Sequence, residues 1–173
     1  LMNTHMLQKG SGKDANVTGL ITQINNKENT HSYQANLKMS QEFEGNETIR
    51  GYGGQLALNK TSGNYKYELE TMFIDDKYNP NDMGFLTRNN MIENELSLRY
   101  DQFKPNKYFV KSNASVSTTY KTLFTNREYI NFNIDWNSSV TLKNYLMIGF
   151  FGHANPFEKI DYLSRYLSRK YIT

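Results

Sequence analysis

The sequence predicts an all-β protein, an antiparallel up-and-down meander that forms part or all of a transmembrane β-barrel. Apolar and polar residues alternate with a period of two, which is the period of a strand and not of a helix. Most alternating segments are longer than the average globular strand of about five or six residues, and they reach the about 9–11 residues that a tilted strand needs to cross a bilayer. All three prolines, Pro80, Pro105 and Pro156, lie in predicted connections, so none interrupts a ladder.

The alternation predicts about eight strands in residues 1–173, as one barrel domain or as a fragment of a larger barrel. They are expected at residues 14–24, 32–43, 49–59, 64–75, 90–102, 107–121, 127–137 and 139–151. In the clearest segment, 127–137, we expect an apolar set to point outward to lipid and a polar set to point inward. The two sets are Ile130, Phe132, Ile134 and Trp136 against Asn131, Asn133 and Asp135.

The composition excludes several classes of protein. The net charge of +3 gives no strong attraction to nucleic acid, and the absence of cysteine excludes disulfides, thiolate metal sites and cysteine nucleophiles. No apolar run of about 18 residues is present, so a transmembrane helix is not expected. Aromatic residues make up 14% of the chain and 13 residues are tyrosine, a mixture that favours exposed β structure over a large helical core.

The charged residues of the predicted strands lie on one face of the alternation. In segment 64–75, Tyr65, Tyr67 and Leu69 alternate with charged residues. We predict that the polar sets of this segment and of 90–102 face a water-filled lumen. The lumen-facing residues are Lys66, Glu68, Glu70, Glu93, Glu95, Arg99 and Asp101. Paired carboxylates can also hydrolyse glycosides, but the alternation already explains these glutamates, so no catalytic residue is assigned.

A soluble alternative shares the same pattern. In a secreted β-sandwich that binds glycans, the apolar faces would be buried against a second sheet, and Trp136 could stack on a sugar. In a barrel, Trp136 would belong to an aromatic girdle at the membrane boundary. The three histidines are scattered and lack metal-binding spacing, so neither a metal site nor a cofactor is predicted.

The pairing of segments 64–75 and 90–102 can be predicted from their charges. Both polar sets must share a face, so an even residue of the first segment must lie opposite an odd residue of the second. We predict the register that sets Glu68 opposite Arg99 and Lys66 opposite Asp101, because directly opposed unlike charges are favourable. The neighbouring register, with Lys66 opposite Arg99, places like charges together.

The connections are predicted to differ on the two sides of the sheet. Short turns are expected near 59–64, 104–107 and 137–139, and longer connections at 75–90 and 121–128, an asymmetry typical of outer-membrane barrels. Asp75, Asp76 and Asp82 could supply oxygen ligands to calcium, but such residues are also common in structured turns. We expect an ordered loop folded over the barrel mouth, because Met83, Phe85 and Leu86 would otherwise be exposed together.

The stretch "SGNYKYELETMFIDDKYNPNDMGFLTRNN" at 62–90 resembles the hallmark of a family of bacterial outer-membrane barrels, typical of Bacteroidota and known only as a domain of unknown function. The matching loop motif comprises Asp75, Asp76, Asn81, Asp82, Gly84, Phe85, Leu86 and Arg88. The closing stretch "PFEKIDYLSRYLSRKY" is also similar to that family, and the resemblance covers roughly residues 50 to 173.

The resemblance implies a location and an architecture and no reaction. It implies the bacterial outer membrane, with the lipid bilayer or lipopolysaccharide as partner and other outer-membrane or surface proteins as further candidates. It implies a transport, pore or surface-scaffold role. In such proteins a module similar to carbohydrate-binding family nine precedes the barrel, so we expect this chain to be an internal fragment of a larger protein.

Overall fold

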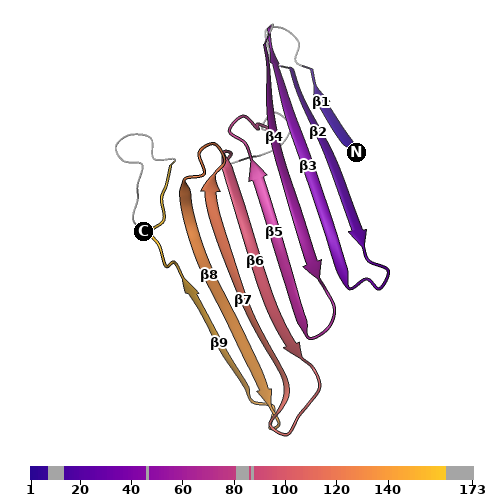
Figure 1. Ribbon diagram of the computed structural model, residues 1–173, viewed down its shortest axis with the longest axis vertical. Helices are drawn as coiled ribbons and strands as arrows, with labels where there is room; N and C mark the ends of the chain where they lie inside the picture. Colours follow the sequence, from indigo (N-terminus) through magenta and orange to yellow (C-terminus); the bar gives the residue numbers. More distant parts are fainter. Residues whose placement is uncertain (8–13, 46, 81–85, 87, 163–173) are drawn as a thin grey trace.

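The computed structural model describes residues 1–7, 14–45, 47–80, 86 and 88–162, and it forms one antiparallel sheet (Figure 1). Each strand pairs with the next strand in the sequence, so the order in the sheet is the order in the chain. The strands are β1 (Met2–Met6), β2 (Asp14–Asn25), β3 (His31–Glu44), β4 (Glu47–Lys60), β5 (Tyr65–Ile74), β6 (Met91–Gln102), β7 (Phe109–Leu123), β8 (Tyr129–Leu142) and β9 (Met147–Ala154). In the described part of the chain, no helix is long and apolar enough to cross a membrane.

The predicted all-β antiparallel meander is confirmed, with two differences in its elements. The sheet has nine strands, because β1 is a five-residue strand too short to show a periodic pattern. The turn expected at 137–139 is wrong, since these residues continue β8 and pair with both neighbouring strands. Asn-Ser-Ser has the composition of a turn, but the turn lies at 143–146, where Tyr145 takes a φ of 65°.

The short connections are closed by polar side chains. In the turn after β2, the Asn26 side-chain oxygen accepts hydrogen bonds from the backbone N–H groups of Thr30 (2.7 Å) and His31 (3.0 Å). In the turn after β4, Gly63 takes a φ of 83°, a conformation that other residues adopt at a cost. The sequence predicted long connections at one end of the strands and short turns at the other. The connection between β5 and β6 is long, but the turn between β3 and β4 at the same end of the sheet is very short, so the predicted difference in length depends mainly on the β5–β6 connection.

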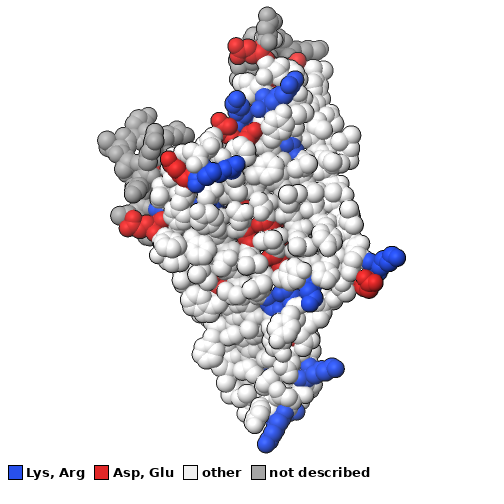
Figure 2. Space-filling view, viewed as in Figure 1, with Lys and Arg blue, Asp and Glu red and all other residues white. Residues whose placement is uncertain are grey.

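The register of the ladders separates the sheet into two faces. The apolar face carries, among others, Leu37, Leu56, Tyr65, Leu69, Phe73, Leu96, Leu98, Val116, Ile134 and Trp136. The polar face carries, among others, Lys66, Glu70, Glu95, Arg99, Ser117, Asn133 and Asp135. In the view of Figure 2, uncharged residues cover most of the surface, and charged residues gather near the strand ends and over the middle of β5 and β6.

The sheet is a single open layer. Figure 1 shows β1 and β9 at opposite edges, and the sheet is not closed into a barrel. Among the described residues, no second sheet covers either face. Of the apolar set of β8, Phe132, Ile134 and Trp136 therefore lie on one face as predicted and are not buried in a sandwich, while Ile130 falls at a register shift and has no opposed partner on β7. What this face contacts remains a prediction.

Two glycines allow aromatic rings to lie flat on the apolar face. A Cβ atom at Gly54 would come within 2.6 Å of Cε1 of Phe73, which stands opposite it on β5. A Cβ atom at Gly152 would overlap the indole ring of Trp136, its neighbour on β8. Each ring thus occupies the space that the glycine leaves, a known way of supporting glycines in sheets.

The predicted register of β5 and β6 is wrong by two residues. The structure sets Lys66 opposite Arg99, Glu68 opposite Ser97 and Glu70 opposite Glu95. The even-to-odd rule is confirmed, because a shift of two residues keeps every side chain on its face. The like charges are compensated diagonally, since Asp101 lies beside both Lys66 and Arg99. On the other face, the rings of Tyr65 and Tyr100 are in contact, with centroids 4.7 Å apart and planes tilted by 45°.

Cysteine pairs can test this register. Thr71 lies opposite Asn94, and the two side chains are 2.9 Å apart (Thr71 Oγ1 to Asn94 Oδ1). We expect the double variant Thr71→Cys/Asn94→Cys to form a disulfide on mild oxidation, because directly opposed residues have Cα atoms about 4.5–5.5 Å apart, within the range that a disulfide spans. Gel mobility with and without reductant measures the yield, and the chain has no cysteine of its own.

The matched control is Thr71→Cys/Leu96→Cys. It is the opposed pair in the register predicted from charges, and in the structure it is a diagonal pair. Efficient cross-linking of this control with none in the first variant would contradict the observed register.

Candidate functional site

The polar face of β5 and β6 holds a buried carboxylate between two cations. Asp101 is 1% exposed, and its Oδ2 lies 3.2 Å from Nζ of Lys66 and 2.9 Å from Nε of Arg99. The backbone N–H of Asp101 extends the ladder by donating to the carbonyl of Asn64 at 2.8 Å. The side chains of Lys66 and Arg99 are partly exposed, so the buried carboxylate of Asp101 is paired with two cations that also reach solvent.

Glutamates occupy the middle of the same two strands. Glu70 lies directly opposite Glu95, and Glu93 forms an ion pair with Lys121 of β7 at 2.9 Å. Along β5 and β6 the polar face is therefore acidic in the middle and mixed near the turn that joins β4 to β5. All seven residues predicted to face the lumen share this face, and whether the face encloses water remains a prediction.

The polar face of β7 to β9 is rich in hydroxyl and amide groups. Ser117, Asp135 and His153 stand opposite one another on the three strands, and His153 Nδ1 lies 2.7 Å from Asp135 Oδ1. A serine nucleophile needs histidine between the serine and the carboxylate. Here the carboxylate stands in the middle, so the row does not assemble that catalytic arrangement.

The segment after β5 is folded onto the polar face, and we call residues 75–80 the strap. The carboxylate of Asp75, which is buried, accepts three backbone hydrogen bonds, from Tyr52 (2.8 Å), Lys77 (3.0 Å) and Tyr78 (2.6 Å). The hydroxyl oxygen of Ser40 on β3 accepts a fourth from the N–H of Asn79 at 3.0 Å. The bonds to Tyr52 and Ser40, which both precede the strap by more than 20 residues in the sequence, attach it to β4 and β3.

The glycine-rich stretch of β4 makes room for the strap. Tyr78 is 5% exposed, and a Cβ atom at Gly51 would overlap the backbone of Lys77 and Tyr78. Burial raises the pKa of Tyr78 above its ordinary value of 10.0. Neither Ser40 nor Tyr78 was singled out from the sequence. The sequence signal for a segment packed closely on the polar face is the pair of glycines at positions 51 and 53, which both lie on that face.

The strap supports the structured-turn interpretation of its aspartates. Asp75 uses its oxygens for backbone N–H groups, while the neighbouring Asp76 is exposed and accepts from the Asn89 side chain only through its backbone carbonyl. Among the described residues, no group of three or more side chains is arranged to hold a metal ion.

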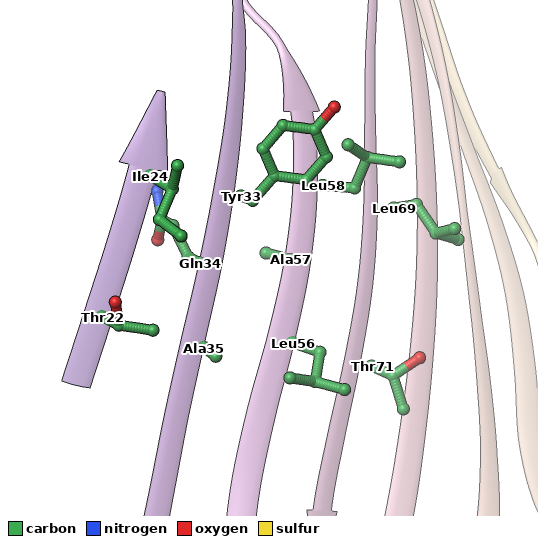
Figure 3. A pocket seen from close by; sticks show the side chains of 10 residues that line it. All are labelled: Thr22, Ile24, Tyr33, Gln34, Ala35, Leu56, Ala57, Leu58, Leu69 and Thr71. Atoms are coloured by element: carbon green, nitrogen blue, oxygen red, sulfur yellow. The ribbon is translucent and has the colours of Figure 1, made fainter. Parts of the chain in front are cut away.

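The apolar face has an open groove of about 470 Å³ across β2 to β5 (Figure 3). Ile24, Tyr33, Leu56, Leu58 and Leu69 line it. Leu56 is 51% exposed and Leu69 48% exposed, which is unusual for leucines at the centre of a sheet. The groove is therefore a continuous apolar surface with no described segment lying over it.

Comparison with protein families assigns the chain. The model of a domain of unknown function, DUF5916, matches residues 1–173. The chain belongs to the DUF5916 family. Searches of curated proteins and of solved structures each gave no match.

The DUF5916 match covers the whole chain, and it confirms the expected membership of a family known as a domain of unknown function. Of the loop motif, Asp75 and Asp76 lie in the strap, Leu86 is half-buried and Arg88 is exposed. The other motif positions, Asn81, Asp82, Gly84 and Phe85, lie outside the described residues. The loop predicted over the barrel mouth falls largely on positions outside the described residues and stays a prediction, while residues 75–80 at its start are docked on the polar face.

Proposed function

We propose that this DUF5916 chain is a segment of a bacterial outer-membrane β-barrel, with a transport, pore or surface-scaffold role. In this arrangement the apolar face contacts lipid and the polar face lines a water-filled interior. The observation that carries the proposal is an apolar face that no second sheet covers in the described part of the chain, on which aromatic residues flank an aliphatic band.

The flanking pattern is clearest along two strands. On β5, Tyr65 and Phe73 stand at the two ends of the apolar set, with Leu69 between them. On β3, Tyr33 and Phe43 stand at the two ends, with Leu37 between them. Outer-membrane barrels carry such aromatic girdles on both sides of a lipid-facing band.

The length of the band also fits. Tyr65 and Phe73 are eight residues apart on β5. At about 3.3 Å per residue this is about 26 Å along the strand, or ~20 Å along the barrel axis at a tilt of about 40°. The two aromatic residues of β5 therefore lie within an apolar band about 25 Å tall, the height typical of such barrels. The strand β5 has 10 residues, within the about 9–11 that a tilted strand needs to cross a bilayer.

Exposure distinguishes this face from the outside of a water-soluble sheet. Leu56, Leu69 and Trp136 are each 45–51% exposed and belong to one contiguous surface. A soluble monomer rarely exposes an apolar patch larger than a few hundred Å². Contact with lipid removes that surface from water without requiring a second sheet.

Membrane extraction tests the proposal. We expect the whole barrel protein that contains this segment, exported in a bacterial host, to fractionate with the outer membrane, to resist extraction with urea and to be released by detergent. We also expect it to migrate differently on a denaturing gel before and after boiling, because closed barrels resist unfolding by detergent. A protein that is monodisperse without detergent would contradict the proposal and favour the soluble alternative.

A further inference from the structure

We infer that the strap is a resident constriction of the barrel, fixed on the lumen side of β3 and β4. The inference rests on the proposed function for the identity of the lumen. It goes beyond that function by naming the segment that limits passage and the residues that hold it in place.

The side of the sheet follows from the contacts of the strap. Gly51 and Ser40, which the strap contacts, both belong to the polar face, because they pair with each other across β3 and β4. With the apolar face toward lipid, a segment that covers Gly51 lies inside the barrel. In this arrangement residues 75–80 lie on the inner wall of the barrel, and the folding of the rest of the loop over the mouth stays a prediction.

The strap is held by bonds along its length and at its base. The Asp75 carboxylate accepts three backbone N–H groups, and its own backbone pairs with Tyr52 and Asn90. At the base, the side chain of Asn89 donates to the carbonyl of Asp76 at 2.7 Å. So many anchored backbone groups indicate a fixed element, not a loop that opens freely.

The strap packs closely against β4, with no space for an added side-chain atom at position 51. The ring of Tyr78 is buried against β4, and the glycine at position 51 is required because any Cβ atom there would overlap the strap backbone. The strap therefore occupies cross-section that solutes would otherwise use, and its removal should widen the passage. Selectivity in pores depends on such constrictions.

The test compares Gly51→Ala with the matched control Gly53→Ala, in the whole barrel protein that contains this segment, reconstituted into planar lipid bilayers. Gly53 is on the same strand and face, and a Cβ atom there would meet its nearest neighbour at an ordinary 3.5 Å. We expect Gly51→Ala to raise single-channel conductance roughly two-fold or more, and Gly53→Ala to leave it unchanged. Tyr78→Ala should also raise it, and this variant leaves β4 unaltered.

Trypsin reports separately on whether the strap is docked. Lys77 is exposed, but its backbone is held against β4, so we expect slow cleavage in the wild type and fast cleavage in Gly51→Ala. Unchanged conductance in Gly51→Ala and Tyr78→Ala, or no conductance in any variant, would overturn the constriction. Resistance to urea extraction is scored in parallel, so a failure of the constriction is distinguishable from a failure of the membrane proposal.

Discussion

With the apolar face in contact with lipid, as proposed, replacing Leu96 by arginine is expected to destabilise the protein by about 2–4 kcal/mol, the scale for arginine on the lipid face near the middle of a bilayer. Leu96 lies on the apolar face opposite Leu69, in the aliphatic band between the aromatic positions. A guanidinium at this depth must lose hydration or distort the bilayer. Reversible unfolding from detergent or lipid vesicles by denaturant measures the change.

Ser97→Arg is the matched control, since Ser97 follows Leu96 on β6 and faces the opposite side. It stands opposite Glu68 on β5 and Ser117 on β7, where a cation meets a carboxylate and polar groups. We expect a change within about 0.5 kcal/mol, as for substitutions at solvated positions. Equal effects of the two arginines would show that the two faces do not differ in environment, which would contradict the barrel.

Replacing Asp75 by alanine is expected to cost about 2–3 kcal/mol of stability, because buried N–H groups left without acceptors each carry a desolvation penalty. The carboxylate is 7% exposed and accepts the N–H groups of Tyr52, Lys77 and Tyr78. Water can reach part of the strap once it loosens, so the loss should be smaller than the sum of three penalties. Denaturant unfolding gives the value.

Asp76→Ala separates this effect from a general loss of negative charge. Asp76 is adjacent in sequence and exposed, and its hydrogen bond to Asn89 uses the backbone carbonyl, which alanine retains. We expect Asp76→Ala to change stability by less than about 0.5 kcal/mol. A loss as large as that of Asp75→Ala would show that the aspartates act through charge and not through the hydrogen bonds of the strap.

The alternation of apolar and polar residues determined most of the architecture. Because side chains in a strand point alternately to the two faces, the period alone placed Tyr65 and Leu69 on one face and Glu68 and Glu70 on the other. It also located the long connection after β5. The alternation did not reveal β1, because that strand has too few residues to display a period. It also did not place residues 137–139, which have the composition of a turn but pair with strands on both sides of β8.

Only the tertiary structure decided the register of β5 and β6 and the position of the strap. A two-residue shift leaves every side chain on its face, so the pattern cannot choose between registers. Pair energies of roughly 0.2–1 kcal/mol are too small to choose either, and a diagonal carboxylate, Asp101, offset the opposed cations. The docking of Tyr78 over Gly51 joins residues 27 positions apart through close backbone packing, which no local pattern encodes.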